Sequence, residues 1–421
     1  MNGNVKLLGM VATASIMLAS CSNDELKEVY KGEKISFTTQ VKTRATETTI
    51  KNLNGFYVYA DADNYEDMFI NGRPAKKEAG KDNTFTIKDE NGGDYLWPTG
   101  VKEVRFWAYG PDNLDKEKTF KPTITTHTQQ FDVLLESSME NGGTNQQDFI
   151  VAYQNVKQAE VTGGAIKLDF YHALSQICIN AKCPDYNNRK VDIKGAWLVN
   201  INQKGNLSFS ENATDTYHMQ WTPSLPSNFG VKLENLPSLT SANTTLIGQA
   251  EGTTGDKSSS LMLIPQKQDK WTTDNTDGTY ILFLCRIEAI HKGTVHSDKD
   301  SNGAIHVEGD YHYHQLFPTP QSDKWNRNEY GYTCVGIDID WKPNHKYVYN
   351  VIFCGQGSGA GVYPPIKLPD LPKIDGIEIV PNEDEDKVGE TVLDSPLSFE
   401  VKVEKWANGT TGDDDGNTNM D

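Results

Sequence analysis

The sequence predicts an all-β chain of β-sandwich architecture. Short runs rich in Val, Ile, Phe, Tyr and Thr alternate between apolar and polar residues, as strands with one buried face do. Clusters of Asn, Asp, Thr and Gly separate these runs, for example at 91–93, 141–143, 162–164 and 276–278. No amphipathic helical pattern longer than about three turns interrupts them. This combination is typical of packed antiparallel sheets.

Residues 1–20 have the pattern of an export signal. Lys6 precedes an apolar run from Leu7 to Leu18, which is shorter than the ~20 residues that a membrane-spanning helix needs. Leu18-Ala19-Ser20-Cys21 then resembles a bacterial lipobox, in which the cysteine is acylated and the chain is cut just before it. We expect lipidation at Cys21; the alternative is an ordinary cleaved signal with an incidental cysteine. The acidic stretch 22–25 resembles the surface-export signal of Bacteroidetes lipoproteins, or is a solvated tether.

Length and charge bound the class of protein. The chain has 421 residues, a formal net charge of −18 and 37% hydrophobic residues. It is long enough for two or three domains with real cores. An acidic surface does not suit nucleic acid, so no such partner is expected. The five cysteines after Cys21 form no CxxC pair, and we interpret Cys178, Cys285 and Cys354 as buried free thiols because each lies in an apolar run.

The first strand and the first domain follow the leader. Ile35, Phe37, Thr39 and Val41 alternate with polar residues, and a polar Thr-rich stretch follows them. Further strands are expected at 56–60 and 104–109. In the run from Leu168 to Ala181 the apolar parity changes, so we predict a bend near 172–174 at which the strand passes from one sheet to another. The first domain is then expected to end at residue 183.

The later chain carries strands at 281–284, 335–339 and 347–353, and then changes character. Alternating glycines at 355–361 and prolines at 364–372 predict a spacer that is first flexible and then stiff. A final amphipathic strand follows, with apolar residues at Leu397, Phe399, Val401 and Val403. The residues 408–421 form an acidic tail that predicts disorder.

The order of several motifs resembles one family. Thr43-Arg44-Ala45 comes shortly after the leader, and five aromatic-rich motifs follow it in order: 53–59, 95–98, 104–109, 148–152 and 168–177. This succession is similar to the fimbrillin-like proteins of Bacteroidetes, the subunits and accessory proteins of type V pili. The likeness covers residues 21 to about 183 and is weaker beyond, although the terminal strand with Trp406 also fits; the tail after Trp406 departs from it.

The resemblance implies a fold and an assembly mechanism. It implies two transthyretin-like β-sandwich domains in tandem on an outer-membrane lipoprotein. A trypsin-like protease would cut between Arg44 and Ala45 and release the first strand with Ile35, Phe37 and Val41. The chain would divide into 1–20 (signal peptide), 21–44 (tether and removable strand), 45–183, 184–407 (with the spacer and terminal strand) and 408–421 (tail).

A strand from a neighbouring pilus subunit would then fill the open groove, by strand addition. The donor strand would carry Leu397, Phe399, Val401 and Val403, whose burial contributes roughly 6–12 kcal/mol before ordering costs. The plainer interpretations are that Arg44 is an ordinary loop arginine and that residues 397–403 remain the last strand of their own sheet. A host or bacterial surface glycan or protein is a further partner that the family implies.

Two other function classes stay open. The first is a surface glycan-binding accessory lipoprotein of a polysaccharide-utilisation system, for which aromatic platforms would come from Trp97, Trp107, Trp197, Trp221, Trp271, Trp325 and Trp341. The second is an enzyme, with a glycosidase as its most plausible form, but no pair of carboxylates is singled out and we expect none. We expect no cofactor and no metal: His306, His312 and His314 lack a partner at recognised spacing, and the Asp413–Asn417 run lacks the glutamate of a calcium loop.

Overall fold

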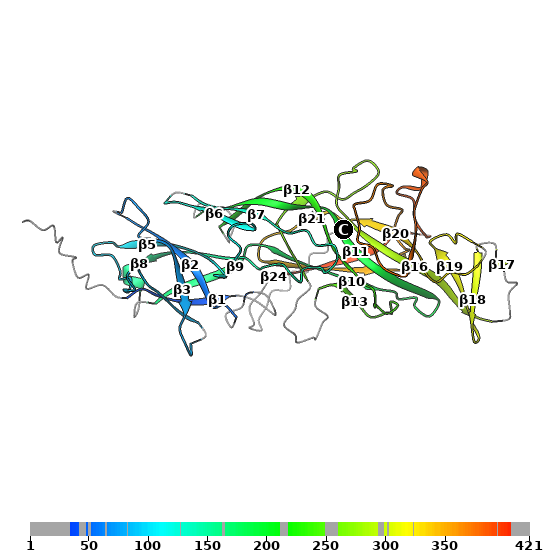
Figure 1. Ribbon diagram of the computed structural model, residues 1–421, viewed down its shortest axis with the longest axis horizontal. Coiled ribbons are helices and arrows are strands. Elements are labelled where there is room, and N and C mark those ends of the chain that lie inside the picture. Colours follow the sequence, from blue (N-terminus) through cyan, green and yellow to red (C-terminus); the bar gives the residue numbers. More distant parts are fainter. Residues whose placement is uncertain are drawn as a thin grey trace, which may run out of the picture.

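The computed structural model shows an elongated all-β molecule (Figure 1). It describes residues 34–41, 48, 52–63, 65–81, 83–126, 128–161, 165–210, 218–248, 260–293, 299–300, 303–322, 324–393 and 395–405. Within these ranges the only helical elements are two short 3₁₀ turns, η1 (Gln158–Glu160) and η2 (Glu385–Lys387). None of the described helices is long and apolar enough to cross a membrane. The prediction of an all-β chain is confirmed.

Seven strands close into a barrel at one end of the molecule (Figure 1). Their order around the barrel is β1-β4-β3-β2-β5-β8-β9. Each strand places alternate apolar side chains inward, and five phenylalanines from different strands, Phe37 among them, meet in the centre. The bounds are β1 (Ser36–Val41), β2 (Gly55–Ala62), β3 (Ile70–Lys77), β4 (Thr84–Ile87), β5 (Glu103–Gly110), β8 (Ile150–Lys157) and β9 (Ala165–His172).

The chain leaves the barrel at the predicted bend. β9 ends at His172, and after two intervening residues β10 (Ser175–Lys182) begins in a different sheet, parallel to β22 (His345–Ile352). Leu168 and Phe170 lie in the barrel core, whereas Ile177 and Ile179 lie in the core of the second body. At the bend the chain therefore passes from the barrel core to the core of the second body. This change of sheet comes at Ala173 and Leu174, ahead of the expected domain boundary at residue 183.

Two larger sheets build the second body. A ten-stranded sheet has the order β17-β18-β19-β16-β11-β7-β6, with β12 added to β11, β20 to β16 and β23 to β20. A five-stranded sheet has the order β13-β10-β22-β24, with β14 added to β10, and β15 pairs with β21 separately. The further bounds are β6 (Phe120–Ile124), β7 (Gln129–Leu134), β11 (Arg189–Phe209), β12 (Met219–Lys232), β13 (Thr244–Ile247), β14 (Leu261–Leu263), β15 (Lys267–Gln268), β16 (Tyr280–Lys292), β17 (Lys299–Asp300), β18 (Gly303–Glu308), β19 (Tyr311–Phe317), β20 (Glu329–Gly336), β21 (Ile339–Asp340), β23 (Glu378–Val380) and β24 (Ser398–Lys405).

The main core draws side chains from both sheets. Ile177 of β10 and Tyr349 of β22 belong to the same buried cluster as Ile193 of β11 and Phe283 of β16. Residues 120–134 lie between barrel strands in the sequence, yet β6 and β7 extend the ten-stranded sheet through β11. The two bodies are thus joined by two separate excursions of the chain out of the barrel.

The Gly/Pro segment does not form the flexible spacer that its composition predicts. Ala360 is fully buried, and the N–H of Gly359 donates to the carbonyl oxygen of Pro396 at 2.9 Å. Further along, Leu368 and Leu371 pack with buried Ile374 in a separate core cluster, which contains Trp197 of β11 and Leu282 of β16. Glycine is needed here for close backbone approach, since a Cβ on Gly359 would lie 1.8 Å from the carbonyl oxygen of Ser395.

Candidate functional site

Strand β1 closes the barrel by joining its two ends. It pairs antiparallel with β4 from Ser36 to Thr38 and parallel with β9 along its whole length, from Ser36 opposite Ala165 to Val41 opposite Phe170. No other described strand links β4 to β9. Release of β1 would therefore leave both neighbours with unpaired backbone N–H and C=O groups.

The inward side chains of β1 occupy the centre of the barrel core. Ile35 and Phe37 are almost completely buried, as predicted, and the ring of Phe37 lies edge-on to the rings of Phe56 and Phe106 at 6.0 and 5.8 Å. For Val41 the structure describes the backbone pairing but not the side chain. Arg44 and Ala45, the predicted processing site, and Cys21, the predicted lipidation site, lie outside the described residues.

A buried polar cluster fixes the chain just after the predicted processing site. The N–H of Thr48 donates to Oδ2 of Asp148 at 2.8 Å, and the other oxygen of that carboxylate accepts from Nδ1 of His172 at 2.9 Å. The N–H of His172 donates to Oδ1 of Asn344 at 3.1 Å. His172 is fully buried, and its hydrogen bonds to Asp148 and Asn344 give it a structural role. The cluster joins Thr48, which precedes β2 in the chain, to the bend between the two bodies.

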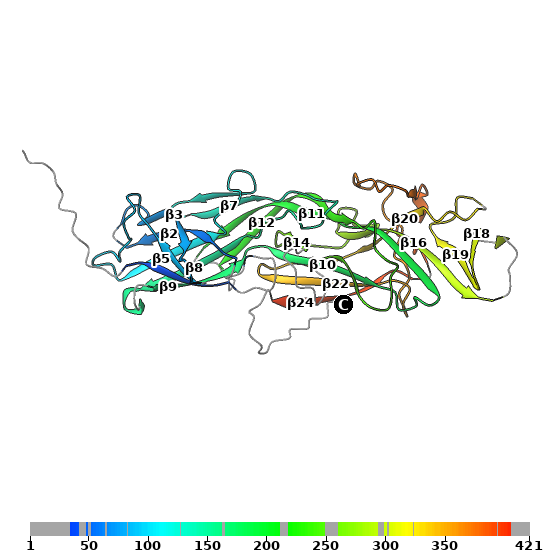
Figure 2. The ribbon, with the colours of Figure 1, turned by 60° about the horizontal axis from the view of Figure 1, so that its bottom comes forward.

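Strand β24 forms the edge of the five-stranded sheet. It runs antiparallel to β22, from Ser398 opposite Ile352 to Lys405 opposite His345 (Figure 2). Leu397 is buried, and Phe399, Val401 and Val403 are half-buried against the main core. Within the described chain, β24 is hydrogen-bonded along one side only. It therefore combines an apolar face with an unpaired edge.

β1 and β24 place their inward side chains at the same spacing. Ile35, Phe37 and Thr39 face inward in β1, and Leu397, Phe399 and Val401 follow the same two-residue period with an aromatic ring at the second position. They differ at the third position. Thr39 is buried, and its hydroxyl has no hydrogen-bond partner among the residues that the structure describes. Burial of an unpaired hydroxyl costs free energy that the corresponding valine of β24 does not incur.

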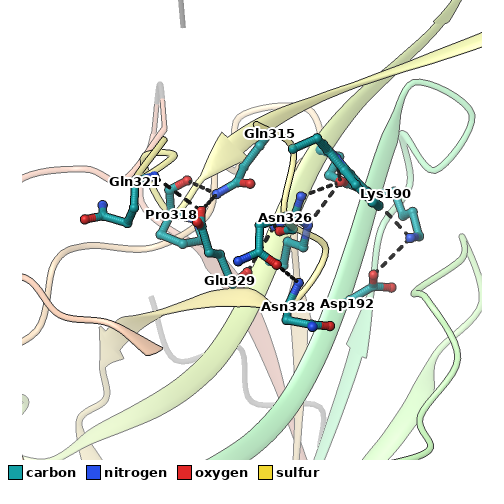
Figure 3. A network of polar contacts seen from close by, with 11 residues as sticks. Lys190, Asp192, Gln315, Pro318, Gln321, Asn326, Asn328 and Glu329 are labelled. Atoms are coloured by element: carbon teal, nitrogen blue, oxygen red, sulfur yellow. Dashed lines mark hydrogen bonds and ion pairs between the residues drawn. The ribbon is translucent and has the colours of Figure 1, made fainter. Parts of the chain in front are cut away.

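A second buried polar network lies toward the other end of the second body and has no counterpart in the sequence predictions (Figure 3). The guanidinium of Arg286 donates to Oε1 of Glu288 through Nε and Nη2, at 3.0 and 2.8 Å. Nη1 donates to the carbonyl oxygens of Asn326 and Glu329, and Oε2 of Glu329 accepts from Nε2 of Gln315.

This network fastens the loop between β19 and β20 to β16. Arg286 and Glu288 pair with each other, and the Glu329 carboxylate accepts hydrogen bonds, so the network is suited to hold structure rather than to transfer protons. Arg286 and Glu288 lie two residues apart in an apolar strand and so on one face of it, a pattern that would have indicated a buried ion pair.

The histidines and tryptophans offer little for a metal or a glycan. His291 and His314 approach through their Nε2 atoms at 2.8 Å and His306 stacks on Trp325, but no group of metal-ligating side chains of sufficient size occurs within the described residues. Only Trp221 and Trp325 of the seven predicted platform tryptophans are half-buried. The others are at least nine-tenths buried: Trp97, Trp107, Trp197, Trp271 and Trp341.

The chain is similar to one protein family and to several solved structures. A family model described as fimbrillin-like matches residues 43–361. Among solved structures, a fimbrial protein from Bacteroides vulgatus shares 14% identity at a TM-score of 0.48, over 88% of this chain and 99% of that one. The C-terminally truncated tip fimbrial protein Mfa3 from Porphyromonas gingivalis shares 9% identity at a TM-score of 0.33, over 89% of this chain and 100% of that one. No curated protein matches the sequence.

The family match covers well over half of the chain and includes all of β2 to β22. It begins at Thr43, one residue before the predicted processing site, and ends before β24. Its description is that of a structural and adhesion family and not of an enzyme family. The chain therefore belongs to the fimbrillin-like family.

Proposed function

We propose that this chain is a cell-surface lipoprotein and a structural or adhesin subunit of a type V pilus, assembled by proteolytic removal of β1 and insertion of a donor strand from a neighbouring subunit. The single observation that carries the proposal is the position of β1, which alone joins β4 to β9 and fills the centre of the barrel. Cleavage after Arg44 would separate this strand from the rest of the chain.

The surroundings of β1 support a groove that survives cleavage. The six remaining strands stay paired in the unbroken order β4-β3-β2-β5-β8-β9. The Asp148 carboxylate holds Thr48, so the new N-terminus at Ala45 would remain tethered close to the bend. Loss of Phe37 would uncover the rings of Phe56 and Phe106, and these rings together with two unpaired strand edges would favour the addition of another strand.

The face and edge of β24 support its role as donor. It presents four apolar anchors at the period of the β1 anchors, and one edge of it is unpaired within the described chain. A copy that donates β24 would place Val401 where Thr39 lies, and so would remove the unpaired hydroxyl from the barrel core. This difference favours exchange over rebinding of β1.

We assign the remaining finer features to the same proposal. The two bodies correspond to the two transthyretin-like domains of the family, since the barrel core and the main core are separate clusters. Acylation of Cys21 anchors the chain in the outer membrane during export, and further pilus subunits are its partners. A surface glycan or protein is the adhesion ligand.

The test follows cleavage and assembly separately. The chain is digested with an arginine-specific protease, and its mass and oligomeric size are measured. We expect a cut after Arg44 followed by a ladder of oligomers, no cut in the Arg44→Ala variant, and cut monomers when residues 397–407 are deleted. A cut product of the full chain that stays monomeric would contradict a stalk role.

Donor binding is measured separately, with the donor strand supplied as a free peptide. A synthetic peptide of residues 395–405 is added to the cut deletion variant, and the matched control peptide carries Phe399→Asp. We expect the first peptide to bind and the second to fail, because a carboxylate would replace the aromatic anchor in an apolar core. Equal binding of the two peptides would show that the groove does not recognise the apolar side chains of β24.

A further inference from the structure

Two cysteines lie at the same end of a central strand pair. Cys183 follows directly after β10, and Cys354 comes two residues after β22. The two strands run parallel with Lys182 opposite Ile352, and the N–H of Phe353 donates to the carbonyl oxygen of Lys182 at 2.8 Å. The strand register therefore brings both cysteines together, although they lie far apart in the sequence.

The backbone of Cys354 departs from regular strand geometry, and its side chain packs against the core that contains Cys183. Successive side chains of a strand point to opposite faces, so a regular continuation would place Cys354 away from the face that holds Cys183 and Phe353. Cys354 instead has φ = 51°, in the left-handed region. A Cβ on the next residue, Gly355, would lie 3.4 Å from Cγ of Pro184, which shows how closely the two segments approach. Sγ of Cys183 donates to the carbonyl oxygen of Arg189 at 3.9 Å, and the interaction between the two thiols lowers the pKa of Cys354 and raises that of Cys183.

The other three described cysteines are placed differently. Cys178 contacts the hydroxyl of Ser260 at 3.1 Å, Cys285 is fully buried in β16, and Cys334 belongs to the core on the other face of the ten-stranded sheet. Among the described residues, only Cys183 and Cys354 are arranged as a pair. Cys183 is fully buried and Cys354 is half-buried, so one of the two thiols is open to a reaction partner.

We propose that Cys183 and Cys354 are a redox modification site and form a disulfide bond in the exported protein. The inference rests on the proposed export of the chain, because disulfide bonds persist in the oxidising compartments outside the cytoplasm. All five described cysteines are free thiols in the structure, as interpreted for Cys178, Cys285 and Cys354; the proposed oxidation would join Cys354 to Cys183 and leave Cys178 and Cys285 as free thiols.

The reaction needs an oxidised dithiol protein as the electron acceptor. The hydrogen bond from Cys183, with help from Arg189, lowers the pKa of Cys354, so its thiolate is the attacking group. This thiolate breaks the acceptor's disulfide and forms a mixed disulfide. Cys183 then loses its proton and attacks Sγ of Cys354, which releases the acceptor as a dithiol. Two electrons and two protons leave the chain. The second step is the slower one, because the same hydrogen bond and burial raise the pKa of Cys183.

The bond would secure the sheet from which β24 departs. β22 lies between β10 and β24, and Ser398 at the start of β24 pairs with Ile352, two residues before Cys354. When β24 leaves, β22 becomes an edge strand held only by β10. A covalent link between the ends of β10 and β22 keeps this pair together. The donor could then extend its last strand without loosening its own core.

The first experiment uses the purified, reduced full-length chain. It is equilibrated with reduced and oxidised glutathione, denatured, alkylated and digested without reduction. We expect a linked peptide that joins Cys183 to Cys354, two fewer alkylated cysteines than in the reduced chain, and a melting temperature raised by roughly 5–10 °C. The linked peptide should vanish in Cys183→Ser and Cys354→Ser and persist in the matched control Cys285→Ala. Because the unmodified chain is mapped directly, misfolding of a variant cannot hide the bond.

Each outcome separates this inference from the pilus proposal. Alkylation of both cysteines without reduction, or a linked peptide at other positions, would overturn the disulfide and leave strand exchange untouched. A further result is that the bond forms in glutathione while protein recovered from the cell surface has both thiols reduced. That result would overturn the disulfide for the exported protein alone. A bond that forms while the cut chain stays monomeric would support the disulfide and contradict the stalk role.

Discussion

The unpaired hydroxyl of Thr39 offers a direct test of how β1 is held. The substitution Thr39→Val keeps the shape of the side chain, removes a buried oxygen that has no partner in the described chain, and adds a methyl group to the barrel core. A buried unsatisfied polar atom costs about 1–3 kcal/mol, and a buried methyl contributes about 0.8 kcal/mol. We therefore expect the free energy of unfolding of the uncut chain to rise by about 2–4 kcal/mol.

The measurement is denaturant unfolding of the uncut chain, followed through tryptophan fluorescence. The matched control is Thr38→Val, on the other face of the same strand, which should stay within about 0.5 kcal/mol of the parent. The Thr39→Val variant should also retain β1 longer after cleavage at Arg44 and form oligomers more slowly. Equal or lower stability of Thr39→Val would refute the argument, because it would show that the hydroxyl is satisfied in the folded barrel.

Further substitutions test the other features. Asp148→Ala should destabilise the chain by about 2–4 kcal/mol in thermal unfolding, because it leaves the N–H of Thr48 and the ring of His172 without their acceptor, whereas exposed Asp132→Ala should cost little. Arg286→Met should cost about 3–5 kcal/mol, because buried Glu288 loses its guanidinium partner and keeps only the longer ion pair with Lys190 at 3.5 Å. Arg105→Met, which breaks a more exposed pair with Asp61, should cost about 1 kcal/mol or less; equal losses would contradict this account. Gly359→Ala should loosen β24 measurably in hydrogen exchange, because its Cβ would clash with the backbone of Ser395. Gly357→Ala, where φ is +72° and nothing lies nearby, should cost only about 1 kcal/mol and leave β24 protected.

Local patterns predicted the strands well because burial on one face leaves a period of two in the sequence. The inward residues Ile35 and Phe37, and the change of parity near Ala173, were all recognisable in this way. The closure of the barrel was not, because parallel pairing of β1 with β9 joins distant segments that carry no mutual signal. Composition was misleading at 355–372, since glycines that allow close packing look the same in sequence as glycines that allow flexibility.

The polar clusters were the least predictable part. Asp148 and His172 were each part of a recognised motif, but only the fold brings the carboxylate to Thr48 and the N–H of His172 to Asn344. The same holds for Glu329 and Gln315 around the buried arginine. The pairing of Cys183 with Cys354 depends on strand register and on one left-handed residue, neither of which a count of cysteines reveals.

The location of β1 and β24 in different bodies has a consequence for symmetry. If β24 of one copy fills the β1 position of the next, the two surfaces in contact are different, so the interface is heterologous and no two-fold axis relates the copies. Repetition of such a contact generates a closed ring or an open helical filament, according to whether the rotation closes. Each added copy would expose a fresh acceptor or a fresh donor, and the filament would have distinct ends. Growth at one end could then be stopped by a single copy that lacks a usable strand there.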